Sequence, residues 1–162
     1  MKIRNIIITL VSAIALLISA STISFAKVVG DKIILGAAVS LTGKYSSNGV
    51  HTQNGYNLAV ERINSMGGVK VGGKNYKFEI IYYDDESNSG RAAQLAERLI
   101  KQDGVQFMLG PYSSGLTKAM APVTEKYGIP MVEANGASRS LFTKGYKYLF
   151  AVLAPANLYL DV

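Results

Sequence analysis

Residues 105–117 read Val105-Gln-Phe-Met-Leu-Gly-Pro-Tyr-Ser-Ser-Gly-Leu-Thr117. A short apolar run ends in Gly110-Pro111, two hydroxyls and a glycine follow, and a helical pattern then begins. This order predicts a strand that turns directly into the N-terminus of a helix. Ligands bind at the carboxyl ends of strands in an open parallel sheet, and a helix N-terminus offers unpaired N–H groups to an anion. The stretch therefore predicts a site for a small anion or carboxylate.

Apolar runs on both sides of this stretch predict the other strands of the same sheet. They lie at 32–39, 77–84, 128–132 and 148–152, and residues 69–76 predict a hairpin whose turn is Gly72-Gly73. Helical spacing predicts three helices. One lies at 53–66, a second begins after the N-cap candidates Ser87, Asn88 and Ser89, and a third lies at 115–127. The first would bury Leu58, Ala59, Ile63 and Met66, and the second Ala92, Leu95, Ala96, Leu99 and Ile100. This alternation predicts an α/β fold with a doubly wound parallel sheet.

The first residues predict a secretory leader that is separate from the fold. Lys2 and Arg4 precede an apolar segment at 6–20, and Ser24-Phe25-Ala26 has the small-x-small pattern of a cleavage site. Residues 1–26 are therefore expected to form a signal peptide that is removed on export to the periplasm. The alternative is a membrane anchor, although the apolar segment is short for a span of about 20 residues.

Charge and cysteine content exclude other classes of function. The leader carries two basic residues and no acidic ones, so its removal lowers the formal net charge from +6 to +4. The lysines are scattered without a basic run, which argues against a nucleic-acid partner. The chain contains no cysteine, which excludes disulfides and thiolate chemistry.

Several enzyme motifs are nearly present, and each fails at a necessary position. Residues 38–45 lack the first glycine and the Ser/Thr of a phosphate-binding loop, and residues 111–115 have a proline where a nucleophile elbow needs glycine. His51, the only histidine, would have to reach a serine from a different loop. The acidic run 84–86 is expected to cap the following helix, with cation binding as the alternative. A hydrolase or nucleotide enzyme is therefore disfavoured, and no metal or cofactor is expected.

Three loops at the carboxyl ends of strands are expected to form the site. They lie at 40–49, 111–115 and 133–138 and should open at the same edge of the sheet. Their hydrogen-bonding groups are Asn48, Ser113, Ser114, Asn135 and the backbone of Gly136 and Ala137, and Tyr112 and Tyr45 are best placed to line an apolar pocket. These groups are neutral and include no general base, so they suit capture of a small polar solute without chemical change.

A family resemblance rests on several short motifs in a fixed order. They are Ile34-Leu-Gly-Ala-Ala-Val-Ser-Leu-Thr-Gly43, Asn48-Gly49, Gly55-x-x-x-Ala59-x-x-x-Ile63-Asn64-x-x-Gly67-Gly68, Tyr83-Asp84-Asp85, Gly110-Pro-Tyr-Ser-Ser114 and Tyr127-Gly-Ile-Pro130. With these motifs the chain resembles the amino-terminal half of type I periplasmic solute-binding proteins. The nearest branch is the leucine/isoleucine/valine, or branched-chain amino acid, receptors of ABC transporters.

The resemblance implies roles for individual residues. Ser114 falls where the family holds the α-carboxylate of its ligand, and the backbone of Asn135 to Ala137 falls where a further loop assists. Asn48 stands where the family often has a tyrosine, and Ala137 where many branched-chain amino acid receptors have a threonine. These departures argue against a leucine-like ligand. The loop Glu133-Ala-Asn-Gly-Ala-Ser138 suggests a divergent branch that also takes non-amino-acid solutes such as carboxylates or amides.

The resemblance also implies an architecture and partners. Residues 27–154 would form the amino-terminal lobe, 155–162 would begin the crossover to a second lobe missing from this chain, and a solute would bind between the two lobes. The partners would be the solute and an ABC permease, the latter being the sole link to the membrane. The alternative is an extracytoplasmic ligand-sensing domain of a signalling receptor. The sequence leaves the solute and the permease unnamed.

Overall fold

The computed structural model describes residues 28–159, so the expected signal peptide lies outside the described residues. A single seven-stranded sheet organises this part of the chain, in the order β3-β4-β2-β5-β6-β7, with β1 paired to β2. The strands are β1 (Val28–Val29), β2 (Lys32–Val39), β3 (Val69–Val71), β4 (Lys74–Asp84), β5 (Met108–Leu109), β6 (Met131–Glu133) and β7 (Leu149–Ala151). The five from β4 to β7 in this order are parallel.

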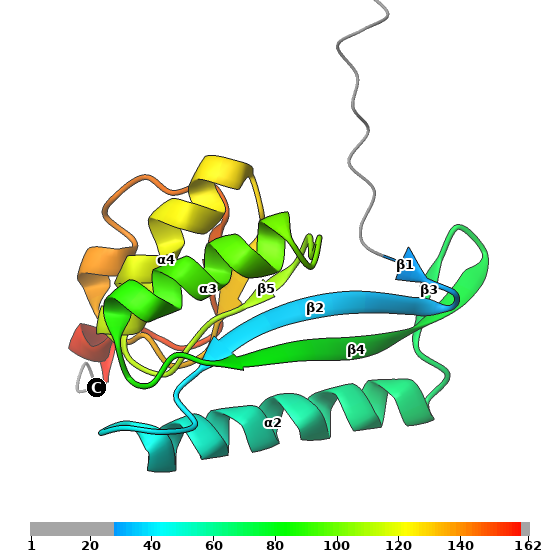
Figure 1. Ribbon diagram of the computed structural model, residues 1–162, viewed down its shortest axis with the longest axis horizontal. Coiled ribbons are helices and arrows are strands. Elements are labelled where there is room, and N and C mark those ends of the chain that lie inside the picture. Colours follow the sequence, from blue (N-terminus) through cyan, green and yellow to red (C-terminus); the bar gives the residue numbers. More distant parts are fainter. Residues whose placement is uncertain (1–27, 160–162) are drawn as a thin grey trace, which may run out of the picture.

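Helices cover both faces of the sheet, as a doubly wound fold requires (Figure 1). The helix α2 (Ser46–Ser65) lies on one face, and α3 (Ser89–Lys101) and α4 (Ser114–Tyr127) pack side by side on the other. Two short 3-10 helices, η1 (Arg139–Leu141) and η2 (Ala156–Leu158), complete the described elements. The predicted fold class is confirmed.

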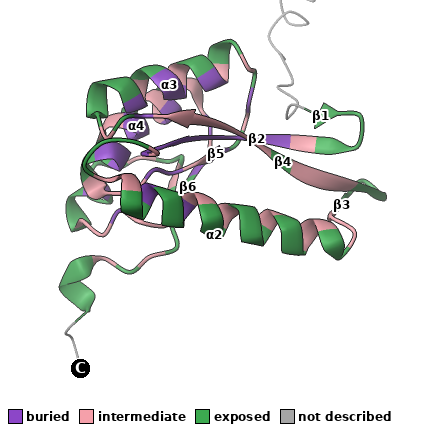
Figure 2. Ribbon diagram, turned by 60° about the horizontal axis from the view of Figure 1, so that its bottom comes forward, coloured by how far each residue is buried: buried purple, intermediate pink, exposed green. Residues whose placement is uncertain are grey.

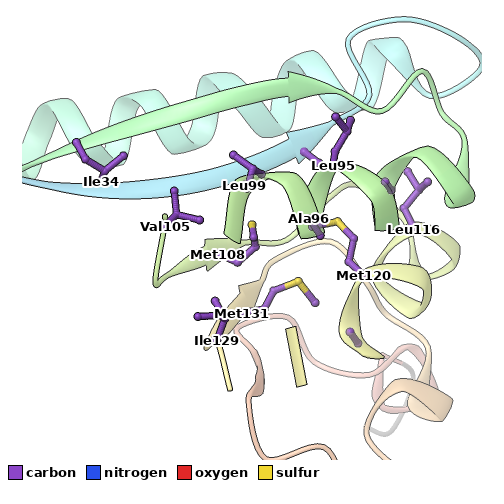
Figure 3. Close-up of a cluster of buried hydrophobic side chains, with 13 residues drawn as sticks. Ile34, Leu95, Ala96, Leu99, Val105, Met108, Leu116, Met120, Ile129 and Met131 are labelled. Carbon is purple, nitrogen blue, oxygen red and sulfur yellow. The ribbon is translucent and has the colours of Figure 1, made fainter. Parts of the chain in front are cut away.

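The hydrophobic core lies between the sheet and the α3–α4 pair. Figure 3 shows α3 side chains facing methionines from β5, α4 and β6. Leu99, Met108, Met120 and Met131 each expose no more than 1% of their surface. The predicted buried face of α3 is confirmed, since Ala92, Leu95, Ala96 and Leu99 are buried and Ile100 packs against the cluster.

The helix α2 differs from its prediction in both its start and its buried face. It begins at Ser46 rather than near residue 53. Leu58 and Met66 are 67% and 69% exposed, and Figure 2 shows that most of α2 is coloured as exposed or intermediate. Its buried residues are Gly49 and Thr52. A Cβ on Gly49 would lie 1.8 Å from the Ser40 carbonyl oxygen, so this close approach requires glycine.

Polar contacts tie the other end of α2 to the sheet. The Asn64 amide donates to the Phe78 carbonyl at 2.8 Å and accepts from the Phe78 N–H at 2.8 Å. The helix α2 therefore packs on the sheet through small and polar residues. The apolar residues that were predicted to form its buried face do not do so.

Most strand boundaries agree with the predictions to within a few residues. The hairpin turns at Gly72-Gly73, both with positive φ, and it joins β3 to a β4 that starts three residues early, at Lys74. The strand predicted at 105–109 is paired only at Met108–Leu109, although Val105 is buried. The strand predicted at 128–132 is found at Met131–Glu133, and it starts late because α4 runs to Tyr127 and Gly128 ends that helix in a left-handed conformation.

An apolar groove opens on the sheet face opposite α3 and α4. It has a volume of about 370 Å³ and is lined by Ile33, Leu35, Val69, Val71, Phe78, Phe107, Met108, Leu109, Pro130 and Val132. Phe107 and Val132 are 41% and 40% exposed there. Among residues 28–159, no helix combines the length and apolarity needed to cross a membrane.

Candidate functional site

The carboxyl ends of β2, β5 and β6 meet at one edge of the sheet. The chain leaves these ends through 40–45, 110–113 and 134–138, in agreement with the three predicted loops. Successive crossovers from β2 go first to β4 on one side and later to β5 on the other. The strand order therefore reverses between β2 and β5, which is where open α/β sheets bind their ligands.

A cavity of about 390 Å³ lies at this edge, and it is named here the cleft pocket. Its lining comes from α2, the loop after β5 and the loop after β6: Asn48, His51, Thr52, Gly55, Tyr56, Tyr112, Ala134 and Asn135. Three of the predicted site residues, Asn48, Tyr112 and Asn135, are thus brought together. The pocket combines amide groups with aromatic rings, a lining suited to a small ligand with polar and apolar parts.

Successive turns of α2 supply five lining residues, four of which sequence reasoning missed. Asn48, His51, Thr52, Gly55 and Tyr56 recur at helical spacing along one face. The spacing is present in the sequence, but a helix predicted to start near residue 53 could not display it. The misplaced start of α2 therefore concealed this wall of the pocket.

Of the two tyrosines predicted to line a pocket, Tyr112 does so and Tyr45 does not. Their rings meet edge to face, with centroids 5.6 Å apart and an interplanar angle of 64°. Tyr112 lines the cleft pocket, whereas Tyr45 is not part of its lining and packs against both the hydrophobic core and the Tyr112 ring. Such a contact restricts the Tyr112 ring.

Ser113 is the N-cap of α4. Its side chain accepts a hydrogen bond from the Leu116 N–H at 3.3 Å, and its φ is 79°. A non-glycine residue with such a φ is strained, and strain of this kind gathers at functional sites. The predicted helix N-terminus therefore faces the sheet edge with a cap held in an unfavourable backbone conformation.

Ser114 links the second and third loops. Its hydroxyl oxygen accepts a hydrogen bond from the Ser138 N–H at 3.0 Å. Thr117 strengthens the same turn by donating to the Ser113 carbonyl at 2.9 Å. The relative position of the two loops thus depends on the Ser114 side chain.

Several backbone groups of the third loop already have hydrogen-bond partners within the protein. The N–H groups of Asn135 and Gly136 both donate to the Glu133 carboxyl, and the Ala137 carbonyl accepts from the Ala156 N–H at 2.7 Å. Gly136 is buried, and neither it nor Ala137 lines the cleft pocket. From this loop, Ala134 and Asn135 face the cavity.

Asp84 and Asp85, at the end of β4, hold the first loop in place, whereas the acidic run 84–86 was predicted to cap α3. Asp84 accepts from the N–H groups of Leu41 and Thr42 and from the Thr42 hydroxyl at 2.7 Å. The cap of α3 is Asn88, one of the three predicted candidates, and its side chain accepts from the Arg91 N–H. Asp84 and Asp85 contact the first loop instead of the N-terminus of α3, whereas Glu86 forms an ion pair with Arg91 of α3 at 2.9 Å.

Two of these carboxyls have shifted pKa values in opposite directions. Burial opposes ionisation of Asp84, but its hydrogen bonds from Thr42, Glu86 and Leu41 outweigh burial and lower its pKa. Asp85 is fully buried, and desolvation raises its pKa although the Ser40 hydroxyl donates to it at 2.6 Å. The first loop is therefore held by one ionised carboxylate and one buried carboxyl.

The residues of the failed enzyme motifs do not form a catalytic relay. His51 lies on α2 at the pocket, and within residues 28–159 no hydrogen bond joins it to Ser113 or Ser114. The described part of the chain also holds no group of three or more His, Cys, Asp or Glu side chains placed to bind a metal ion.

A family comparison covers most of the described chain. Residues 32–158 match the family model described as periplasmic binding protein. The leucine-, isoleucine-, valine-, threonine- and alanine-binding protein of Pseudomonas aeruginosa is 27% identical over 128 residues, which are 79% of this chain and 33% of that protein. The chain thus spans about a third of the length of the curated relatives that it matches.

Solved structures of solute-binding proteins also resemble this chain over about a third of their length. The branched-chain amino acid transporter substrate-binding protein LivJ of Streptococcus pneumoniae, solved with isoleucine, has a TM-score of 0.68 and 32% identity, covering 76% of this chain and 34% of its own. A solute-binding protein of an ABC transporter from R. palustris, solved with 4-hydroxybenzoate, has a TM-score of 0.61 and 30% identity, covering 75% and 31%.

Proposed function

This chain belongs to the periplasmic binding protein family, and we propose that it forms one wall of a receptor that captures a small carboxylate solute without changing it. The cleft pocket carries this proposal. It lies at the reversal point of the strand order, has a volume of about 390 Å³ and is lined by amide groups and aromatic rings. Such a lining grips a solute through hydrogen bonds and apolar contact.

A carboxylate is the chemical group that the named ligands of two relatives share. One relative was solved with isoleucine and another with 4-hydroxybenzoate. In this chain Ser113 and Ser114 do not themselves line the cleft pocket, but they follow directly after Tyr112, which does, and they begin α4. The N–H groups and dipole at this helix N-terminus favour an anion. Hydrogen bonds to a charged group contribute roughly 1.5–3 kcal/mol each, so two or three suffice for capture.

The division of roles among the site residues follows from their positions. We assign the solute carboxylate to Ser114 and the α4 N-terminus, and the rest of the solute to Asn48, Tyr112 and Asn135. Gly136 and Ala137 were predicted to contribute backbone contacts; neither lines the cleft pocket, and the Gly136 N–H donates to Glu133, so this proposal gives them no direct contact with the solute. The aromatic wall of the pocket would accept either an aliphatic side chain or a ring.

The proposed partner is the permease of an ABC importer, and the proposed compartment is the periplasm. Both rest on what the relatives are and on the predicted leader at 1–26, which suits export.

Calorimetric titration tests the proposal, with isoleucine, leucine, valine and 4-hydroxybenzoate as probes. We expect heat of binding for at least one probe and a loss of roughly tenfold in affinity for Ser114→Ala, since a charged hydrogen bond and a loop link are removed. Ser65→Ala is the matched control, because Ser65 donates to Arg62 at the far end of α2. Absence of heat with every probe would refute solute capture, and equal affinity for Ser114→Ala would remove Ser114 from the site.

A further inference from the structure

Glu133 is a buried carboxyl at the end of β6, just before the loop that supplies Ala134 and Asn135 to the cleft pocket. Its exposed fraction is 0%. One oxygen, Oε2, accepts from the N–H groups of Asn135 (3.1 Å) and Gly136. The other, Oε1, is buried and has no hydrogen-bond partner among the described residues. One carboxyl oxygen of Glu133 therefore anchors the loop after β6 through two backbone hydrogen bonds.

Two glycines leave space for this carboxyl group. A Cβ on Gly110 would lie 2.6 Å from the Glu133 Cβ, and a Cβ on Gly136 would lie 2.6 Å from Oε2. Both contacts are shorter than atoms tolerate, so both positions require glycine, and the contact at Gly136 is the one that involves the carboxyl group. Because the two loop N–H groups are directed at Oε2, a side chain without an acceptor would leave them unpaired, which is costly in a buried place.

The groups around Glu133 come from three elements. Tyr56 of α2 donates to the Gly110 carbonyl at 2.8 Å, and burial together with the Glu133 charge raises the pKa of Tyr56. Thr117 of α4 and Leu141 of η1 lie beside Gly136 and do not titrate. Desolvation raises the pKa of Glu133 itself, against the effect of its two backbone hydrogen bonds. Proton binding at Oε1 would leave both N–H bonds at Oε2 in place.

We propose that Glu133 is the positioning residue of the cleft pocket, and that its hold on Asn135 and Gly136 gives the third loop the shape that a carboxylate solute requires. The inference rests on the proposed function. A protonated Glu133 would place no negative charge behind the loop that faces the solute carboxylate. The affinity for such solutes should therefore fall as the pH rises through the pKa of Glu133, because the ionised group would repel them.

Three variants test this role by amide NMR and by titration with isoleucine and 4-hydroxybenzoate. Glu133→Ala should shift the Asn135 and Gly136 amide signals and weaken binding roughly tenfold. Glu133→Gln keeps one acceptor oxygen and cannot ionise, so it should bind like the parent at acidic pH and lose the pH dependence. Glu125→Ala is the control, since Glu125 also accepts from two backbone N–H groups, those of Lys147 and Tyr148, before β7 at the opposite edge.

The possible outcomes distinguish the role of Glu133 from solute capture itself. A parent chain that binds neither probe overturns solute capture, and the inference with it. A parent that binds, with Glu133→Ala binding equally well and its loop amides unmoved, overturns the role of Glu133 alone. If Glu133→Ala fails to fold, Glu133→Gln decides: retained affinity without pH dependence supports the role, and affinity as pH-dependent as that of the parent contradicts it.

Discussion

Two adjacent serines at the start of α4 have different tasks although the sequence presents them as a pair. Ser113 caps the helix with a φ of 79°, and Ser114 accepts from the Ser138 N–H. The sequence predicted both at the site, because a strand followed by hydroxyls and a helix is a local pattern. It could not assign the loop link, which depends on a residue 24 positions later.

The strained cap at Ser113 gives a prediction about stability. Ser113→Ala removes the cap and keeps the unfavourable φ, so we expect a loss of about 1 kcal/mol in the free energy of unfolding. Ser113→Gly removes the same hydroxyl but relieves the backbone, and it should be more stable than Ser113→Ala. Urea unfolding measures both. Equal stability of the two variants would show that the backbone at Ser113 is not strained.

At the scale of elements, α2 shows what local pattern can and cannot predict. The parallel strands, the glycine hairpin and the buried face of α3 follow from periodicity, which the structure confirms. The first turns of α2 do not, since Ser46, Ser47 and Gly49 individually favour a loop. They are helical because Gly49 allows close packing on Ser40, a contact between segments that no local pattern displays.

Two glycines of α2 provide a matched test of that packing. A Cβ on Gly49 would lie 1.8 Å from the Ser40 carbonyl oxygen, whereas one on Gly55 would meet nothing within 4 Å. Gly49→Ala should therefore destabilise the fold by about 1–3 kcal/mol or more, and Gly55→Ala should stabilise it by up to about 1 kcal/mol, since alanine favours a helix. Thermal unfolding distinguishes the two. A Gly49→Ala variant as stable as Gly55→Ala would contradict the close approach.

The brace between β4 and the first loop should depend on pH. The pKa of Asp84 is lowered in the fold, so its ionised form contributes stability above the ordinary aspartate pKa, and this is lost as pH falls through the lowered value. Asp84→Asn should thus be about 1 kcal/mol less stable near neutral pH, and the difference should shrink on acidification. Urea unfolding at a series of pH values measures it. A difference in stability between the two proteins that does not change with pH would show that the charge of Asp84 does not stabilise the fold.

At the scale of the whole molecule, the two sides of the sheet are unequally covered. The core under α3 and α4 is closed, whereas the apolar groove on the other side leaves Phe107 and Val132 about two-fifths exposed. Exposed apolar surface of this kind binds hydrophobic dyes and promotes association.

That groove should make the chain bind anilinonaphthalene sulfonate while folded. Replacing Phe107 by Ser together with Val132 by Thr should reduce the dye fluorescence, with a change in stability within about 0.5 kcal/mol per site, because both side chains are exposed. Leu158→Ser is the control, since Leu158 is 50% exposed outside the groove. Equal dye binding by all three proteins would place the dye elsewhere.

The central claim is that the cleft pocket holds a carboxylate solute, and amide NMR of the chain during titration with isoleucine and 4-hydroxybenzoate tests it most directly. We predict that binding shifts move signals from the start of α2, from 112–114 and from 134–138, the three segments that meet at the pocket. Shifts that gather instead around Glu97, Arg98 and Lys101 on the outer surface of α3, or no shifts with either solute, would contradict the claim.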